Sequence, residues 1–180
     1  MAPSPGAVGG TVPCHRVGPG AHAVAVNATT PTIVYTDGAC LGNPGPGGWA
    51  WAVPTPGGDP GEWFASGPDP WTTNQRMEIT AVLEALGAVA GPVEVMSDST
   101  YVVNCFRQRW WAGWEARNWR NARGRPVANQ DLWRPLVDQV RGRGQVRFAW
   151  VKAHAGDPVN EFVDRLAVEA ATSQSPRRGS

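Results

Sequence analysis

From residue 32 to residue 66 the chain alternates short apolar runs with glycine- and proline-rich breaks, and this alternation limits what the chain can fold into. Apolar runs at 32–40, 48–53 and 62–66 have the length of strands, and Gly/Pro turns separate them. Connections this short suit hairpins. The pattern therefore predicts three antiparallel strands joined as a meander.

Helical and strand patterns then follow one another. Residue types that cap helices, Thr72-Thr73-Asn74, precede a helical apolar pattern that ends at Gly91-Pro92. A fourth strand is expected at 93–97, a helix at 99–106, a helix capped by Asn129, and a fifth strand at 146–151. Asp157-Pro158 is a good start for a last helix, with Asp at the cap and Pro in the first turn. This order indicates an α/β domain.

The two ends of the chain lack such patterns. Residues 1–31 are rich in proline and glycine without a sustained apolar period, so we expect a disordered tail. Residues 173–180 are small, polar or basic and are expected to be a flexible C-terminal tail. One domain at 32–172 results. We also expect that the native start lies nearer Val24 or Val26.

Composition excludes several classes of protein. No run approaches the roughly 18 apolar residues of a membrane-spanning helix, and the apolar run at 23–26 is too short for a signal peptide. We therefore expect a cytoplasmic protein without a membrane partner. The three cysteines, Cys14, Cys40 and Cys105, lack CxxC spacing and are interpreted as reduced thiols rather than a zinc site.

Four carboxylates stand where local motifs meet predicted elements. Asp37 follows the apolar run 32–36 of the first strand, just before the glycine-rich stretch 38–48, and Glu78 lies in the first turns of the following helix. Asp98 follows the fourth strand, and Asp164 shares a helix face with Asn160. Each acid alone is more often a surface group. Together they indicate one metal site assembled by folding, because hard cations prefer oxygen ligands.

A second local feature is basic. Six arginines lie within nineteen residues that contain one acid, Glu115, although the net charge of the chain is only +1. The segment could face a polyanion. The arginines are Arg107, Arg109, Arg117, Arg120, Arg123 and Arg125.

Four strings carry a resemblance to a known family. They are YTDGACLGNPGPGG at 35–48, TNQRME at 73–78, SDS at 97–99 and VKAHAG at 151–156. In order and spacing they closely resemble type 1 ribonuclease H, the bacterial ribonuclease HI branch, from about 32 to 172. The resemblance implies a ribonuclease H-like fold: a mixed five-stranded sheet, three antiparallel strands then two parallel, flanked by helices.

The resemblance also implies an activity. Such an enzyme is an endonuclease that hydrolyses the RNA strand of an RNA/DNA hybrid with two Mg²⁺ ions, for which Mn²⁺ can substitute, and leaves 5′-phosphate and 3′-hydroxyl ends. Its expected role is the removal of RNA primers and R-loops. We expect a monomer that binds the hybrid and has no obligate protein partner. An aromatic, basic hybrid-binding module is not expected in residues 1–31.

Catalytic roles follow from family positions. Asp37, Glu78, Asp98 and Asp164 would be the metal ligands. His154, in a Gly/Ala-rich loop, would transfer protons, since histidine titrates near neutral pH. On loop context alone, His154 would be an ordinary exposed histidine.

Binding roles follow in the same way. Asn43, Asn74 and Gln75 match positions that contact the 2′-hydroxyl, Thr73 and Asn129 match phosphate contacts, and Ser99 would assist beside Asp98. Helix capping is an equal alternative for Thr73, Asn74 and Asn129. The glycine-rich loop lacks the GxxxxGK[ST] pattern of a nucleotide cradle. A basic protrusion would grip the DNA strand, with packing favoured for Trp110 and Trp111 and DNA contact expected from Trp114, Arg117, Arg120 and Arg123.

Two departures from the family and two other functions remain open. Glu115 stands where relatives often carry lysine and Thr100 where they often carry glutamine, so hybrid binding could be weaker. One alternative is a binding domain without catalysis, which the intact acids disfavour. The other is a nuclease of the same superfamily that acts on DNA, which the 2′-hydroxyl-reading residues disfavour.

Overall fold

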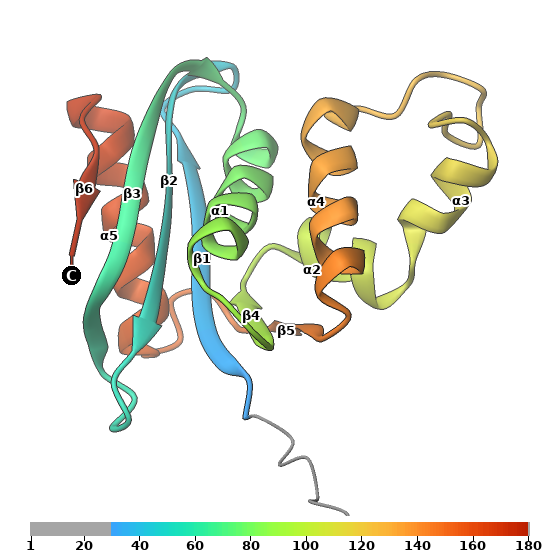
Figure 1. Cartoon of the computed structure of the whole chain (residues 1–180). Helices are drawn as coiled ribbons and strands as arrows, with labels where there is room; N and C mark the ends of the chain where they lie inside the picture. Colours follow the sequence, from blue (N-terminus) through green and yellow to red (C-terminus); the bar gives the residue numbers. More distant parts are fainter. Residues whose placement is uncertain (1–29, 180) are drawn as a thin grey trace, which may run out of the picture.

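The computed structural model describes residues 30–179 as one mixed β-sheet with helices on both faces (Figure 1). The strand order is β5-β4-β1-β2-β3-β6. The first three strands are antiparallel neighbours, whereas β4 pairs in parallel with β1, and β5 in parallel with β4. The strands are β1 Thr32–Cys40, β2 Gly45–Pro54, β3 Pro60–Thr72, β4 Val93–Ser97, β5 Val146–Trp150 and β6 Arg177–Arg178.

The helices cover the sheet unequally. In Figure 1, α5 lies against one face, α1 packs on the other, and α4 stands beside α1 away from the sheet. The short α2 follows β4 and lies next to α4, and the short α3 lies on the far side of α4 from the sheet. The helices are α1 Asn74–Ala88, α2 Thr100–Arg107, α3 Trp110–Ala116, α4 Gln130–Arg143 and α5 Pro158–Ser173.

Strand alternation divides the core into two layers. In β2, Ala50 and Ala52 pack against α5, while Trp51 belongs to the larger core on the α1 side. Trp133 of α4 is completely buried in that larger core. The small alanines let α5 lie close to the sheet, and this close approach brings the start of α5 next to β1.

The sheet has six strands rather than the five expected. The sixth, β6, pairs antiparallel with β3 through Ala65 and Ser66, inside the segment expected to be a flexible tail. The chain reverses after α5 at Gln174, which has a left-handed backbone. Arg177 then forms an ion pair with Glu169 at 2.6 Å. This short strand covers part of an edge that would otherwise be open.

Two strands are longer than their apolar runs suggested. The strand β3 continues to Thr72, although 62–66 was the expected range, and β2 begins at Gly45 rather than at 48. Proline at 68 and 70 hid this extension, because proline is tolerated near a sheet edge but reads as a break in sequence. The expected N-terminal tail lies outside the described residues, apart from Thr30 and Pro31.

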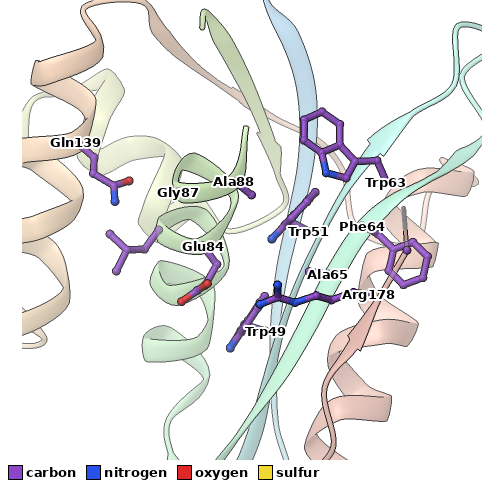
Figure 2. A pocket seen from close by; sticks show the side chains of 12 residues that line it. Trp49, Trp51, Trp63, Phe64, Ala65, Glu84, Gly87, Ala88, Gln139 and Arg178 are labelled. Carbon is purple, nitrogen blue, oxygen red and sulfur yellow. The ribbon is translucent and has the colours of Figure 1, made fainter. Parts of the chain in front are cut away.

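A cavity of about 580 Å³ opens between the sheet and α1. Figure 2 shows Trp49, Trp51 and Trp63 on its sheet side, Glu84 on its helix side, and Arg178 of β6 reaching across it. Among residues 30–179, the helices are all too short or too polar to cross a membrane.

Candidate active site

Close packing of β1 on α1 sets the position of the first acid. A side chain at Gly38 would meet the backbone nitrogen of Glu78 at 2.3 Å, so only glycine allows this contact. The Gly38 N–H donates to Oδ1 of Asp37 at 2.7 Å. Asp37 itself is 7% exposed. The sequence Asp37-Gly38 therefore places a fixed carboxylate beside the first turns of α1.

Three of the four expected acids meet at this point. One carboxylate oxygen from each of Asp37, Glu78 and Asp98 lies within 4.8 Å of the others. They come from β1, α1 and the end of β4, which neighbours β1. The fourth acid, Asp164 of α5, is half-buried and stands outside this group, but its charge acts on Asp37.

Burial and mutual repulsion make the cluster costly when no cation is present. Burial, followed by the charge of Asp98 and then that of Asp164, raises the pKa of Asp37 to about 8. Burial and the charges of Asp37 and Asp98 hold the pKa of Glu78 well above its usual range. A bound cation would reverse this cost, because it favours the ionised carboxylates.

The acids are oriented by neutral donors. Nδ2 of Asn74 donates to Oε1 of Glu78 at 3.2 Å, and Nδ2 of Asn160 donates to Oδ2 of Asp98 at 3.3 Å. The indole of Trp150 donates to the backbone oxygen of Asp98 at 3.1 Å. Sequence reasoning assigned no role to Asn160, although its place one helical turn before Asp164 was a usable signal.

One oxygen of the cluster lacks a protein partner. Oε2 of Glu78 is buried and accepts no hydrogen bond from residues 30–179. Buried polar atoms are normally satisfied. An unpaired carboxylate oxygen on a residue clustered with two further acids fits a divalent cation, and the all-oxygen donor set suits Mg²⁺ or Mn²⁺.

The other two residues expected at the catalytic centre lie at different depths. Ser99 is buried at the N-cap of α2, where its hydroxyl accepts from the backbone N–H of Val102 at 3.4 Å. The neighbouring Ser99 side chain also lowers the pKa of Glu78, against the larger effect of burial. His154 is exposed in the loop between β5 and α5, has φ 49°, and stands outside the acid group.

The expected 2′-hydroxyl readers adjoin the cluster. The backbone N–H of Asn74 donates to Oδ1 of Asn43 at 3.3 Å, so the glycine-rich loop and the start of α1 are joined. Gln75 is exposed one residue further along. Thr73 is the N-cap of α1 and accepts from the backbone N–H of Arg76 at 3.4 Å. Thr73 therefore caps its helix, which is one of the two roles expected for it; the other, a phosphate contact, stays a prediction.

Asn129 does not cap its helix, which corrects one of its two expected roles. It occupies the N-cap position of α4 with φ 57° and makes no side-chain cap hydrogen bond. Its Oδ1 instead accepts from Nη1 of Arg76 at 3.5 Å, and both Arg76 terminal nitrogens bind Asp131, at 3.0 and 2.7 Å. Arg76 thus ties the start of α1 to the start of α4.

The basic protrusion comprises α3 and the following loop, residues 110–126. Its Trp114 is half-buried and packs against Trp119 and Trp133, with ring centroids 6.1 and 5.6 Å apart. Packing of this kind was expected for Trp110 and Trp111, which do border the same core. The three arginines expected to bind the DNA strand are exposed: Arg117, Arg120 and Arg123.

Comparisons with known proteins point in one direction. The family model for RNase H matches residues 29–172. The chain is 51% identical to a ribonuclease H from Granulibacter bethesdensis over 139 residues. The aligned region covers 76% of this chain and 89% of that protein. It is 47% identical to a ribonuclease HI from Caulobacter vibrioides, over 82% of this chain and 98% of that protein.

Solved structures agree. LC9-RNase H1, described as a type 1 RNase H with the type 2 active-site motif, superposes with a TM-score of 0.69 at 34% identity, over 83% of this chain and 77% of that one. LC11-RNase H1, solved in complex with an RNA/DNA hybrid, has the same fold at a TM-score of 0.60 and 22% identity, over 78% of this chain and 96% of that one. The chain therefore belongs to the ribonuclease H family, in its type 1, ribonuclease HI branch.

Proposed function

We propose that this protein is an endonuclease that hydrolyses the RNA strand of RNA/DNA hybrids with divalent metal ions. The observation that carries the proposal is the meeting of Asp37, Glu78 and Asp98 within 4.8 Å. The names of the relatives, ribonuclease H and ribonuclease HI, support it, as does the hybrid complex of LC11-RNase H1.

The acids would hold the metal. Asp37, Glu78 and Asp98 would supply oxygens to a first Mg²⁺, and Asp164, whose charge acts on Asp37, would supply a further oxygen ligand for a second ion. Mn²⁺ is a possible substitute, because it accepts the same ligands. Bound Mg²⁺ would make water a better nucleophile and neutralise charge on the phosphate.

The protein's own groups prepare this centre. Asn74 and Asn160 donate to Glu78 and Asp98, so the carboxylates keep one orientation whether or not they are ionised. The exposed loop of His154 allows its imidazole to reach the scissile phosphate and transfer a proton at the attacking or leaving oxygen. The half-exposed Trp150 fixes the backbone at Asp98.

RNA would be recognised by the side-chain amides of Asn43 and Asn74; in the described part of the chain, one has a free hydrogen-bond donor and the other a free acceptor. Asn43 uses its Oδ1 on the backbone of Asn74, which leaves its NH₂ as a donor. Asn74 uses its NH₂ on Glu78, and among residues 30–179 no donor reaches its Oδ1. One donor and one acceptor match a 2′-hydroxyl, which can both accept and donate. Deoxyribose offers neither group.

The DNA strand would lie toward α4 and the basic protrusion. The N-terminus of α1 with Thr73, together with Asn129, offers phosphate contacts. Arg117, Arg120 and Arg123 add charge further along this surface. In this mechanism the enzyme acts as a monomer, leaves 5′-phosphate and 3′-hydroxyl ends, and serves to remove RNA primers and R-loops.

The test is cleavage of an end-labelled RNA/DNA hybrid with Mg²⁺, beside single-stranded RNA, duplex RNA and duplex DNA. Asp98→Asn should abolish cleavage and keep hybrid binding, while Asp138→Asn, an exposed acid on α4, should cut normally. Full activity in Asp98→Asn would remove the metal-site assignment. Hybrid binding without any cutting would favour the binding-domain alternative, and cutting of duplex DNA would favour the DNA nuclease.

A further inference from the structure

A second hollow lies at the other end of α2 from the acid cluster. Ser99, at the start of this helix, borders the acids, whereas Phe106 and Arg107 at its end line a cavity of about 430 Å³. Eight helical residues separate the two places by about 12 Å. Val140, near the end of α4, also lines the cavity. The cavity therefore lies at the opposite end of α4 from Asn129, the residue at the start of that helix.

The floor of this cavity is aromatic. The rings of Phe106 and Phe148 stack with centroids 4.1 Å apart and planes 4° from parallel. Trp111, from the start of α3, adds a third aromatic wall. A flat aromatic floor beside aliphatic side chains favours an apolar group as occupant.

The rim of the cavity is cationic. Arg107, Arg109 and Arg147 line it, and all three are exposed. The ion pairs formed within residues 30–179 use other arginines: Arg76, Arg141 and Arg177. Glu94 is opposite Arg147 in the register but makes no ion pair with it. Three cations without a carboxylate partner around one hollow complement an acidic ligand.

The third feature is an open sheet edge. Strand β5 is the last strand on its side and pairs only with β4 within the described part of the chain. Its residues Val146, Arg147 and Phe148 line the cavity. The opposite edge, by contrast, is partly covered by β6. An unpaired edge offers backbone hydrogen bonds to an added strand.

We propose that β5 and this cavity form a docking site for an acidic, extended segment of a partner protein. The segment pairs as an extra strand on β5 and places one aromatic or aliphatic side chain on the Phe106–Phe148 floor. Its carboxylates meet Arg107, Arg109 and Arg147. We favour a protein strand over nucleic acid because an open strand edge pairs with the backbone of a peptide, whereas it has no matching hydrogen-bond pattern on a nucleic-acid base.

The probe is a fluorescein-labelled nonapeptide that alternates glutamate with valine around a central phenylalanine. Anisotropy with the full-length protein should show saturable binding. Arg147→Glu and Arg107→Glu should each weaken it by about tenfold, the change expected for removal of one charge-assisted hydrogen bond. Arg178→Glu, an exposed arginine on the opposite edge strand, is the matched control and should change nothing.

Two altered peptides separate the contributions. A peptide with central serine should bind about tenfold more weakly, because the floor loses its apolar partner. Peptides with N-methylated backbone nitrogens in alternating registers should differ, with one of the two registers losing binding because its strand hydrogen bonds cannot form. Equal binding of both registers would overturn the added strand.

Other outcomes would overturn the site itself. Loss of affinity below twofold in both arginine variants, or no binding at about 1 mM peptide, would refute it. Displacement of the peptide by a single-stranded oligothymidine or by an RNA/DNA hybrid would assign the surface to nucleic acid instead. Hybrid cleavage by Arg147→Glu should equal that of the wild type, so this result stands apart from the proposed activity.

Discussion

Replacing Asp37 by asparagine should stabilise the metal-free protein. Asp37 is 7% exposed, and its pKa of about 8 exceeds the ordinary value of 3.8 because the carboxylate is buried beside other acids. Between pH 3.8 and 7 the unfolded chain releases this proton and the folded chain keeps it. At about 1.4 kcal/mol for each pH unit, the folded state loses about 4 kcal/mol of stability.

Asparagine removes this loss and retains one useful hydrogen bond. Its Oδ1 can still accept from the Gly38 N–H, which now donates at 2.7 Å. Burial of the asparagine amide costs about 1 kcal/mol, which reduces the stabilisation from about 4 to about 3 kcal/mol. The free energy of unfolding of Asp37→Asn at pH 7 should therefore exceed that of the wild type by about 3 kcal/mol, which corresponds to about 10 °C in Tm. The gain should be absent below the unfolded pKa, grow as pH rises, and level off near pH 8.

The assay is urea unfolding in EDTA at several pH values, with Asp138→Asn as an exposed control that should shift stability by less than about 0.5 kcal/mol. Added Mg²⁺ should stabilise the wild type and have a smaller effect on Asp37→Asn, because the variant lacks a ligand. Equal stability of variant and wild type at pH 7, or a gain of the same size at pH 4 and pH 8, would refute the electrostatic account.

Three further predictions concern catalysis and hybrid binding. His154→Ala should lower kcat by about 10²-fold and leave hybrid binding unchanged, as measured by single-turnover cleavage; a loss of binding instead would remove the proton-transfer role. Arg76→Ala should raise KM more than it lowers kcat, because the starts of α1 and α4 are no longer tied, and Asp131→Asn should do the same to a smaller degree. An unchanged KM in both would make the pair irrelevant to binding. The third variant replaces Arg117, Arg120 and Arg123 by alanine. The slope of the logarithm of the hybrid-binding constant against the logarithm of salt concentration should become shallower by about 0.7–0.9 for each phosphate that is no longer neutralised. An unchanged slope would mean that the protrusion has a structural role.

Much of the fold followed from local patterns in the sequence. The antiparallel start was predictable because each hairpin is encoded by adjacent residues, and α5 was predictable from Asp157-Pro158. Asp157 does accept from the backbone N–H groups of Val159 and Asn160 at 3.0 and 3.1 Å. Strand β6 could not be predicted, because two arginines have no strand pattern and take their place through pairing with β3 and packing beside α5.

The site shows the same division. The positions of Asp37, Glu78 and Asp98, where local motifs meet predicted elements, indicated a shared site, and folding brings these three together. The roles of Arg76 and Asn160 arise between elements far apart in sequence: Arg76 binds Asp131, and Asn160 binds Asp98. The partner in each pair cannot be identified from adjacent residues, although the place of Asn160 one helical turn before Asp164 marked it as a candidate. Trp114 packs against neighbouring aromatic rings, which its place among arginines did not indicate, and its contact with the DNA strand stays a prediction.

Glu115 illustrates how a departure from the family pattern changes meaning in three dimensions. In sequence it removes a positive charge from the basic segment, which predicts weaker hybrid binding. In the structure it accepts from Arg141 of α4 at 2.9 and 2.5 Å, and Arg141 also lies 4.5 Å from the ring centroid of Trp111. An exposed ion pair contributes at most about 1 kcal/mol, so these interactions add little stability. Their larger consequence is geometric: α3 is held on α4 before substrate arrives, and the acid is neutralised within the protein. Because a protrusion ordered in advance loses less entropy on binding, the expected weakening should be smaller than the missing charge alone implies.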